Sequence, residues 1–410
     1  MKTGYTPLIA ENYPPSNAKS IVVFDGDGKE VGEVSIAKMR PVNLGKPLYS
    51  FGLVSDMHVG TFGDAAIANQ TKLDNALSFF EEFEFEEFEK KGCDFCCHSG
   101  DMTMFGFWFP FDEARQQSYF YPDDFDAYKK ILDKHKNLPM HGCVGNHESY
   151  NNYAIVQTRT DSYANTSRVP KSKVAENWGD PTKSYNNLEL LKAYTGRDLC
   201  YTMTQKNEVT KKDDVFIFFG QPGGSAPVER DKWIEQLGWL QNELESHRNQ
   251  RCFVFEHLTL ADDSGNPTIQ DGDSDGIHNA FWGNLENTFK GLMAHYKNTI
   301  VFHGHSHLRP DQQDKVSYAN YNVKHGFRSF SVPSTAACRY IDIDNNKLET
   351  DKPVNTSFCY IATAYPNHLV LRAYNLADKS EVAIAQYCID MTIQPIEGGT
   401  FTDKTGIITT

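Results

Sequence analysis

The feature that most constrains the fold of this chain is an alternation of short apolar segments with segments of helical spacing. Residues 48–55 and 93–99 are apolar and strand-like. Between them, apolar side chains recur at the spacing of one helix face, at Leu73, Leu77, Phe80 and Phe83. Strands that alternate with helices in this way predict βαβ units and therefore a sheet with parallel strands.

The alternation then continues as far as a long polar interruption. We predict a helix over residues 125–135 and a strand over residues 140–144. Residues 150–200 are rich in Asn, Ser, Thr and Tyr, which indicates a long loop or an inserted cap rather than core.

A second α/β half follows the interruption. Its strands are expected at 215–220, 252–256 and 299–304, with a helix over 231–246 between the first two. Three later apolar segments have no long helices between them, which predicts antiparallel closing strands at 327–333, 358–365 and 368–375.

Both ends of the chain lie outside this alternating region. Residues 1–48 contain two β-like segments around Asp25-Gly26-Asp27-Gly28, which predicts a β-hairpin. The acids of this turn could bind calcium, but turn geometry alone favours Asp and Gly there. We therefore expect an N-terminal extension over residues 1–48, a main domain over residues 49–375, and C-terminal strands with a tail over residues 376–410.

The charge of the chain limits the partners that it can have. With 54 acidic and 40 basic residues, the formal net charge is -14. Polyanions are repelled at long range and no basic run offsets this, so an extended nucleic-acid surface is not expected. The acidic segment 81–89 also contains Phe83, Phe85 and Phe88, a mixture that predicts an amphipathic helix rather than a charged tail.

The cysteines indicate the compartment. They are nine, an odd number, and several lie in apolar strand-like segments, which predicts reduced and buried thiols. Cys93, Cys96 and Cys97 resemble half of a zinc ribbon, but no second pair follows. The sequence has neither an apolar segment of the signal-peptide kind at its start nor an apolar window long enough to span a membrane. We expect a cytoplasmic protein without a membrane partner.

Polar side chains follow the apolar segments at the points where the strands should end. They are Asp56, His58, Asp101, Asn146, His147, His257, His305 and His307. Open α/β sheets bind their ligands at this edge, so these side chains should gather there. Singly, each has an ordinary explanation, such as a helix cap for Asp101 or a turn for Asn146. Together they offer the mixed oxygen and nitrogen ligands that suit transition metals.

The order of these residues also forms a family pattern. The chain contains Asp56-Met57-His58, Gly100-Asp101, Gly145-Asn146-His147-Glu148, then His257, and finally Gly304-His305-Ser306-His307. This ordered series resembles the motifs of the calcineurin-like metallophosphoesterases, over about residues 50–310. The resemblance implies a four-layer α/β/β/α sandwich, to which the N-terminal β-hairpin is an extension.

The resemblance further implies a centre of two divalent metal ions, drawn from Mn, Fe, Zn, Co and Ni. One ion would be bound by Asp56, His58, Asp101 and His307, and the other by Asp101, Asn146, His257 and His305. Asp101 would then bridge the pair. A metal-bound hydroxide would attack a small phosphate-ester substrate. The chain is thus expected to be a metal-dependent phosphoesterase, either a phosphatase or a phosphodiesterase.

His147 has a separate role in the family pattern, because it is not a metal ligand there. When protonated, it can stabilise charge on the phosphoryl group or donate a proton to the leaving group. Glu148 is expected to orient a neighbouring loop or His147. The chain departs from many family members after His257, where it has Leu258-Thr259-Leu260 in place of a second polar residue and a proline. Contacts to the metal or the substrate are therefore expected to differ there.

The remaining candidates are less specific. The acidic segment 271–276 begins like a calcium loop, but the twelfth position is Trp282 instead of Glu, so a solvated loop near the site is expected. His98 and His303 lie within apolar strands and are expected to be core residues. Four residues are further candidates for substrate contact: Arg309, Arg339, His278 and Tyr150.

Two other functions are compatible with the sequence. The fold could serve as a catalytically silent binding module, although the complete ligand set and His147 argue against this. A dinuclear metallohydrolase could also act on a substrate other than a phosphate, since the metal centre alone does not select the substrate. The histidine that is not a ligand favours phosphate esters.

Overall fold

The computed structural model describes most of the strands and helices that the sequence predicts. The described residues are 20–24, 30–35, 44–61, 64–85, 88, 90–104, 122–149, 192, 195–222, 230–260, 282, 285–312, 321–323, 326–342, 347–350, 356–396, 398–404 and 407–408. Most of the predicted cap, the acidic segment 271–276, the turn of the N-terminal hairpin, Tyr150 and His278 lie outside these residues.

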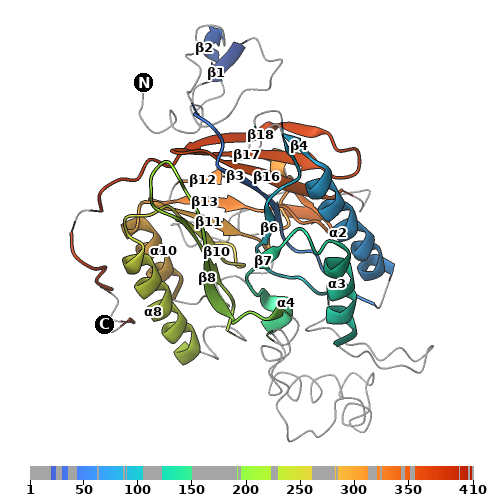
Figure 1. Cartoon of the computed structure of the whole chain (residues 1–410), viewed down its shortest axis with the longest axis horizontal. Helices are drawn as coiled ribbons and strands as arrows, with labels where there is room; N and C mark the ends of the chain where they lie inside the picture. The colour runs from blue at the N-terminus through green and yellow to red at the C-terminus, as the bar shows by residue number, and fades with distance from the viewer. Residues whose placement is uncertain are drawn as a thin grey trace, which may run out of the picture.

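The first of two six-stranded sheets unites the two ends of the main domain (Figure 1). Its order is β18-β17-β16-β3-β6-β7. The parallel strands are β3 (Tyr49–Val54), β6 (Phe95–His98) and β7 (Met140–Gly142). The antiparallel strands are β16 (Phe358–Ala364), β17 (His368–Asn375) and β18 (Glu381–Asp390). Because β16 pairs with β3, late and early segments of the chain lie side by side.

The second sheet has the order β12-β13-β11-β10-β9-β8. Its parallel strands are β9 (Asp214–Phe219), β10 (Cys252–Phe255), β11 (Thr299–His303) and β13 (Arg328–Ser331). Antiparallel strands β8 (Cys200–Gln205) and β12 (Tyr321–Asn322) form its two edges.

The prediction that 327–333 is an antiparallel closing strand is wrong, because β13 runs parallel to β11. Parallel neighbours need a crossover of about a dozen residues or more. Among its described residues, the connection between these strands contains η3 (Pro310–Gln312) and β12. The other two closing strands, β16 and β17, are antiparallel as predicted.

Two pairs of helices cover the outer faces of the sheets. Helices α2 (Asp64–Glu82) and α3 (Pro122–Lys134) pack on the first sheet, with Leu73, Leu77 and Phe80 buried at the predicted helical spacing. Helices α8 (Arg230–Ser246) and α10 (Leu285–His295) pack on the second sheet and lie on the opposite flank of the molecule (Figure 1). The predicted mixed α/β fold is confirmed.

A core of aromatic side chains joins the inner faces of the two sheets. Phe51 and Phe95 of the first sheet stack at 5.3 Å between ring centroids, and Phe216 of the second sheet lies 5.3 Å from each of them. Each fully buried phenylalanine contributes roughly 1.5–3 kcal/mol relative to exposure. This packing fixes the two sheets against each other, so the ends of their strands meet at one edge.

The helix predicted over the acidic segment 81–89 is wrong. Helix α2 ends at Glu82, and β4 (Glu84–Phe85) pairs with β5 (Lys90–Lys91) in a small hairpin. The Gly92 N–H donates to the carbonyl of Phe83 at 2.8 Å and closes the turn. Phe83 and Phe85 are two residues apart, which is a strand spacing, and their rings meet at 4.7 Å between centroids.

Two further hairpins lie outside the two large sheets. The predicted N-terminal hairpin is confirmed as β1 (Ser20–Phe24) paired with β2 (Glu30–Ser35), and β14 (Arg339–Asp342) pairs with β15 (Lys347–Thr350). All nine cysteines lie in the described part of the chain, and none of them forms a disulfide bond. Among the described helices, none combines the length and the apolar character that crossing a membrane requires.

Candidate metal centre

The eight polar residues that the sequence places after strands come together in the structure. Asp56 and His58 follow β3, Asp101 follows β6, and α4 (Asn146–Ser149) begins after β7 with Asn146 and His147. The second sheet supplies the rest, since His257 follows β10 and His305 and His307 follow β11. The centre therefore forms where the carboxyl ends of both sheets meet.

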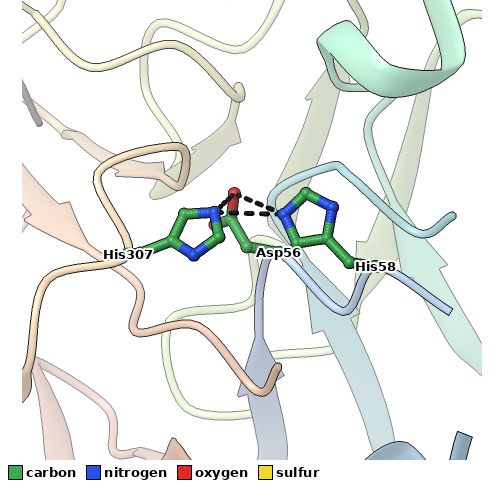
Figure 2. A group of neighbouring side chains, drawn as sticks. All are labelled: Asp56, His58 and His307. Carbon is green, nitrogen blue, oxygen red and sulfur yellow. Dashed lines mark hydrogen bonds and ion pairs between the residues drawn. The ribbon is translucent and has the colours of Figure 1, made fainter. Parts of the chain in front are cut away.

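Asp56, His58 and His307 form the first cluster of possible metal ligands (Figure 2). The Nε2 of His307 lies 3.1 Å from Asp56 Oδ1 and 3.0 Å from His58 Nε2. The Nε2 of His58 is 3.9 Å from the same carboxylate oxygen. Three donor atoms that converge in this way are suited to hold one cation.

Asp101, His257 and His305 form a second cluster. The Nε2 of His257 is its centre, at 3.2 Å from Asp101 Oδ2 and 3.1 Å from His305 Nδ1. Asn146 Oδ1 lies 2.7 Å from the same nitrogen. These are the four residues that the family pattern assigns to the second ion.

Asp101 lies between the two clusters. Its Oδ2 is 3.2 Å from His257 Nε2 in one cluster and 3.8 Å from His58 Nε2 in the other. His147 Nε2 is also 3.8 Å from this oxygen, and His58, Asp101 and His147 form a third possible cluster. Distance alone thus does not distinguish His147 from the ligands.

Backbone carbonyls fix how three of the histidines present their rings. Nδ1 of His257 lies 2.7 Å from the carbonyl of Ser99, Nδ1 of His307 lies 2.8 Å from that of Ala337, and Nδ1 of His147 lies 2.5 Å from that of Met104. A carbonyl only accepts, so each Nδ1 carries the hydrogen and donates it. Each Nε2 is left to face the centre, which is how histidine ligands are oriented in metal sites. The donor set therefore fits divalent metal ions.

The centre carries negative charge that is held away from water. Asp56 and Asp101 are 0% and 1% exposed. Burial alone would raise the pKa of Asp56, but His307 and His257 lower it to about 2, and His257 and His147 likewise hold the pKa of Asp101 well below its usual range. Burial would lower the pKa of His257, yet the two carboxylates raise it to about 10. The surroundings thus favour positive charge at this point.

The backbone is unusual at five of the candidate ligands. Among the described residues, seven that are not glycine have positive φ, and five of these are Asp56 (47°), His58 (45°), Asp101 (50°), His305 (64°) and His307 (55°). This left-handed conformation costs roughly 1–2 kcal/mol per residue, although Asp and His adopt it more readily than most. Such strain concentrates at functional sites, where the surrounding structure holds it in place.

Two glycines allow the loops of the centre to approach closely. A Cβ at Gly145 would lie 2.2 Å from Asp101 Oδ1, and a Cβ at Gly304 would lie 2.0 Å from Ser55 Oγ and 2.7 Å from Asp56 Oδ2. Side chains at these positions would displace the two carboxylates. Gly145 and Gly304 are therefore required because no side chain fits between these positions and the carboxylates.

Glu148 ties two of the loops together, as expected. Its buried carboxylate accepts the backbone N–H of Thr103 at 2.9 Å and that of Gly145 at 3.0 Å. These bonds connect the loop after β6 to the loop after β7 and so set His147 against Met104 and Asp101.

A cavity of about 560 Å³ opens above the centre. His58, Asp101, His147, His305 and His307 are among the residues that line it. One wall is a face of α2, and the other comes from the end of the segment before β14 and the first residue of β14. The described wall residues are Asp64, Ala65, Ala68, Asn69, Lys72, Ala336, Ala337 and Arg339. The floor can therefore hold metal while the walls contact whatever binds to it.

Lys72 and Asn69 also line the cavity, and neither is among the sequence-predicted site residues. Asn69 Nδ2 donates to the carbonyl of His58 at 3.0 Å, and the Nζ of Lys72 donates to the carbonyl of Ala336. The available signal was the spacing of 65, 68, 69 and 72, which places them on one face of α2. That face could be assigned to the cavity only once the position of the helix was known.

The other candidates have different positions. Arg339 lines the cavity, whereas Arg309 pairs with Asp311 at 2.7 Å and is absent from the described lining residues. His98 and His303 are buried, as expected. Leu258 and Leu260, at the departure from the family pattern, pack in the core beneath α8 and α10. This segment is therefore part of the packing of the second sheet.

Comparison with known proteins gives one family and several similar structures. A sequence model described as calcineurin-like phosphoesterase matches residues 49–309. No curated protein matches the chain. The chain is similar to the structure of GAP50, described as the anchor in the inner membrane complex of Plasmodium, at 12% identity and a TM-score of 0.46, over 86% of this chain and 91% of that chain. It is also similar to a predicted phosphoesterase from Streptococcus pneumoniae TIGR4, at 8% identity and a TM-score of 0.30, over 83% and 97%.

Proposed function

Because the chain belongs to the calcineurin-like phosphoesterase family, we propose that it hydrolyses a small phosphate ester at a centre of two divalent metal ions. The observation that carries this proposal is that Asp101 lies between the two clusters of possible ligands, with its Oδ2 3.2 Å from His257 Nε2 in one and 3.8 Å from His58 Nε2 in the other. Asp56, His58 and His307 would complete one ion's ligands, and Asn146, His257 and His305 the other's. Bound there, the ions would acidify a water nucleophile and hold the phosphate oxygens.

The residues of the chain supply position and charge for this reaction. The carbonyls of Ser99 and Ala337 orient His257 and His307, so that the ligands are in place before substrate arrives. His147 presents Nε2 to the cavity because Nδ1 is bonded to Met104. It would donate a proton to the leaving oxygen or stabilise the charge that develops on the phosphoryl group.

Two observations favour an enzyme over a silent binding module. Every ligand position of the family pattern carries a residue that can bind metal in this chain. His147, which a structural metal site would not need, lines the same cavity. A hydrolase of some other substrate would fit the ligands equally well. The family and His147 favour phosphate esters. A screen of monoester and diester substrates would decide between these two classes.

We also propose a compartment and a kind of partner for the protein. Nine cysteines without a disulfide bond support a reducing compartment such as the cytoplasm. The net charge of -14 supports a small substrate bound at a local metal centre over an extended nucleic-acid partner.

We expect the purified protein to bind about two divalent ions per chain, because Asp101 lies between two clusters of possible ligands and would bridge an ion in each. Reconstitution with Mn, Fe, Co, Ni or Zn, followed by elemental analysis, measures this. A stoichiometry well below one with every metal would contradict the proposed centre. The loaded forms should then be screened against mono- and diesters, which tests the activity itself.

Asp101→Asn should remove more metal than Asp56→Asn, because only Asp101 lies close to both clusters. We expect loss of about two ions in the first variant and about one in the second, since an amide lacks the charge of a bridging carboxylate. Elemental analysis of both variants, with circular dichroism to verify folding, makes the comparison. Equal losses from two folded variants would argue against the bridge.

A further inference from the structure

The walls of the cavity carry charge opposite to that of its floor. Lys72 on α2 and Arg339 at the start of β14 both line it. Asp64 is the single carboxylate among the described wall residues, and it is exposed at the first position of α2. The chain has a net charge of -14, so two cationic side chains at one cavity differ from its average charge.

Lys72 is bonded to the segment before β14 rather than extended into solvent. Its Nζ donates to the carbonyl of Ala336, and its side chain is about half buried. The carbonyl of the next residue, Ala337, accepts the Nδ1 hydrogen of His307. The ammonium group is thus anchored one residue from the carbonyl that orients a candidate metal ligand, and burial strengthens its field in the cavity.

Arg339 is attached to the same ligand loop. Its backbone N–H donates to the carbonyl of His307 at 2.7 Å, and its carbonyl accepts from Arg309 at 2.9 Å. These bonds fix the origin of the side chain beside the centre. A guanidinium that starts there can bind a carboxylate or phosphate with two parallel hydrogen bonds.

We propose that Lys72 and Arg339 bind a second anionic group of the substrate. The preferred substrates are then phosphate esters whose other part carries a carboxylate or a further phosphate. This inference rests on the proposed phosphoesterase function, since the ester phosphate must occupy the metal centre while the second group lies between the walls.

Calorimetric titration of the manganese-loaded protein tests the inference without turnover. The probes are phenylphosphonate, 3-carboxyphenylphosphonate and 1,3-phenylenebisphosphonate, which differ only in the second group. We expect a charged second group to tighten binding by about tenfold, the scale of one charge-assisted contact. In Lys72→Met and in Arg339→Gln this advantage should fall below about threefold. The ratio of kcat/KM for 3-carboxyphenyl phosphate to that for phenyl phosphate should fall in parallel.

Lys130→Met is the matched control, because it removes one exposed lysine of α3 that does not line the cavity. It should keep the full advantage. Stronger binding of the bisphosphonate or of the carboxylate identifies the second group, and either result supports the subsite. Equal affinity of all three probes would overturn it while leaving the phosphoesterase proposal intact. Failure of phenylphosphonate to bind the loaded protein at all would overturn both.

Discussion

His147→Ala should lower kcat by about 100-fold or more while both metal ions remain bound, which is the scale for loss of one acid or charge-stabilising donor. The structure explains why metal should remain, since the histidine's own N–H to Asp101, at 3.0 Å, comes from the backbone and survives the substitution. The Nε2 that faces the cavity does not survive it. Steady-state kinetics and elemental analysis of the same preparation test both parts.

The leaving group separates two roles for His147. If proton donation dominates, the loss should be smaller for 4-nitrophenyl phosphate than for an alkyl phosphate, because nitrophenolate leaves without protonation. If charge stabilisation dominates, the two losses should be similar. His247→Ala is a suitable control, since this histidine bonds to Gln250 at the end of α8, outside the cavity. An unchanged kcat in His147→Ala would make His147 a structural residue, and loss of metal would make it a ligand.

Arg251→Met should destabilise the metal-free fold by about 3–5 kcal/mol, the usual effect of removing one partner of a buried ion pair. Arg251 is 1% exposed, and its Nε lies 2.7 Å from Asp214 Oδ1. Its Nη1 donates to the carbonyl of Tyr365 at 2.6 Å, and the hydroxyl of Tyr49 donates to Asp214 at 2.7 Å. Methionine would fill the space but leave the Asp214 carboxylate buried without its partner.

Urea denaturation in the presence of a chelator measures this effect without the stabilisation that bound metal adds. The control is Lys129→Met, which breaks an exposed ion pair with Asp133 and should cost less than about 1 kcal/mol. The double variant Arg251→Met/Asp214→Asn should recover part of the loss, because no charge is then left buried. A cost below about 1 kcal/mol for Arg251→Met alone would show that this network contributes little.

The sequence predicted which side chains come together in the candidate centre because one rule connects them. Polar residues that end parallel strands gather at one edge, so Asp56, Asp101 and His257 could be placed together without knowing any contact. The same rule says nothing about a helix face, and Lys72 was missed for that reason. Nor does local pattern reveal strand direction, which is why β13 was assigned the wrong orientation. That choice depends on pairing with β11, and such pairing joins distant segments.

The errors in short segments have a different origin. Over 81–89, acidic residues and phenylalanines fit a helix by composition, yet Phe83 and Phe85 point to one face only in a strand. The Arg251 network could not be predicted at all, because Tyr49, Asp214, Arg251 and Tyr365 come from four distant segments. Each looks unremarkable where it stands in the sequence.

The left-handed backbone of the ligand loops has a consequence for the descent of this family. A lineage that ceased to bind metal would lose the selection for Asp or His at positions 56, 58, 101, 305 and 307, but its loops would keep their path. Glycine and asparagine adopt such a backbone with little strain, whereas alanine and branched residues do not. Descendants that have become binding proteins should therefore have drifted to glycine and asparagine at these positions. Substitutions of this kind would mark the loss of catalysis in a relative whose fold is otherwise intact.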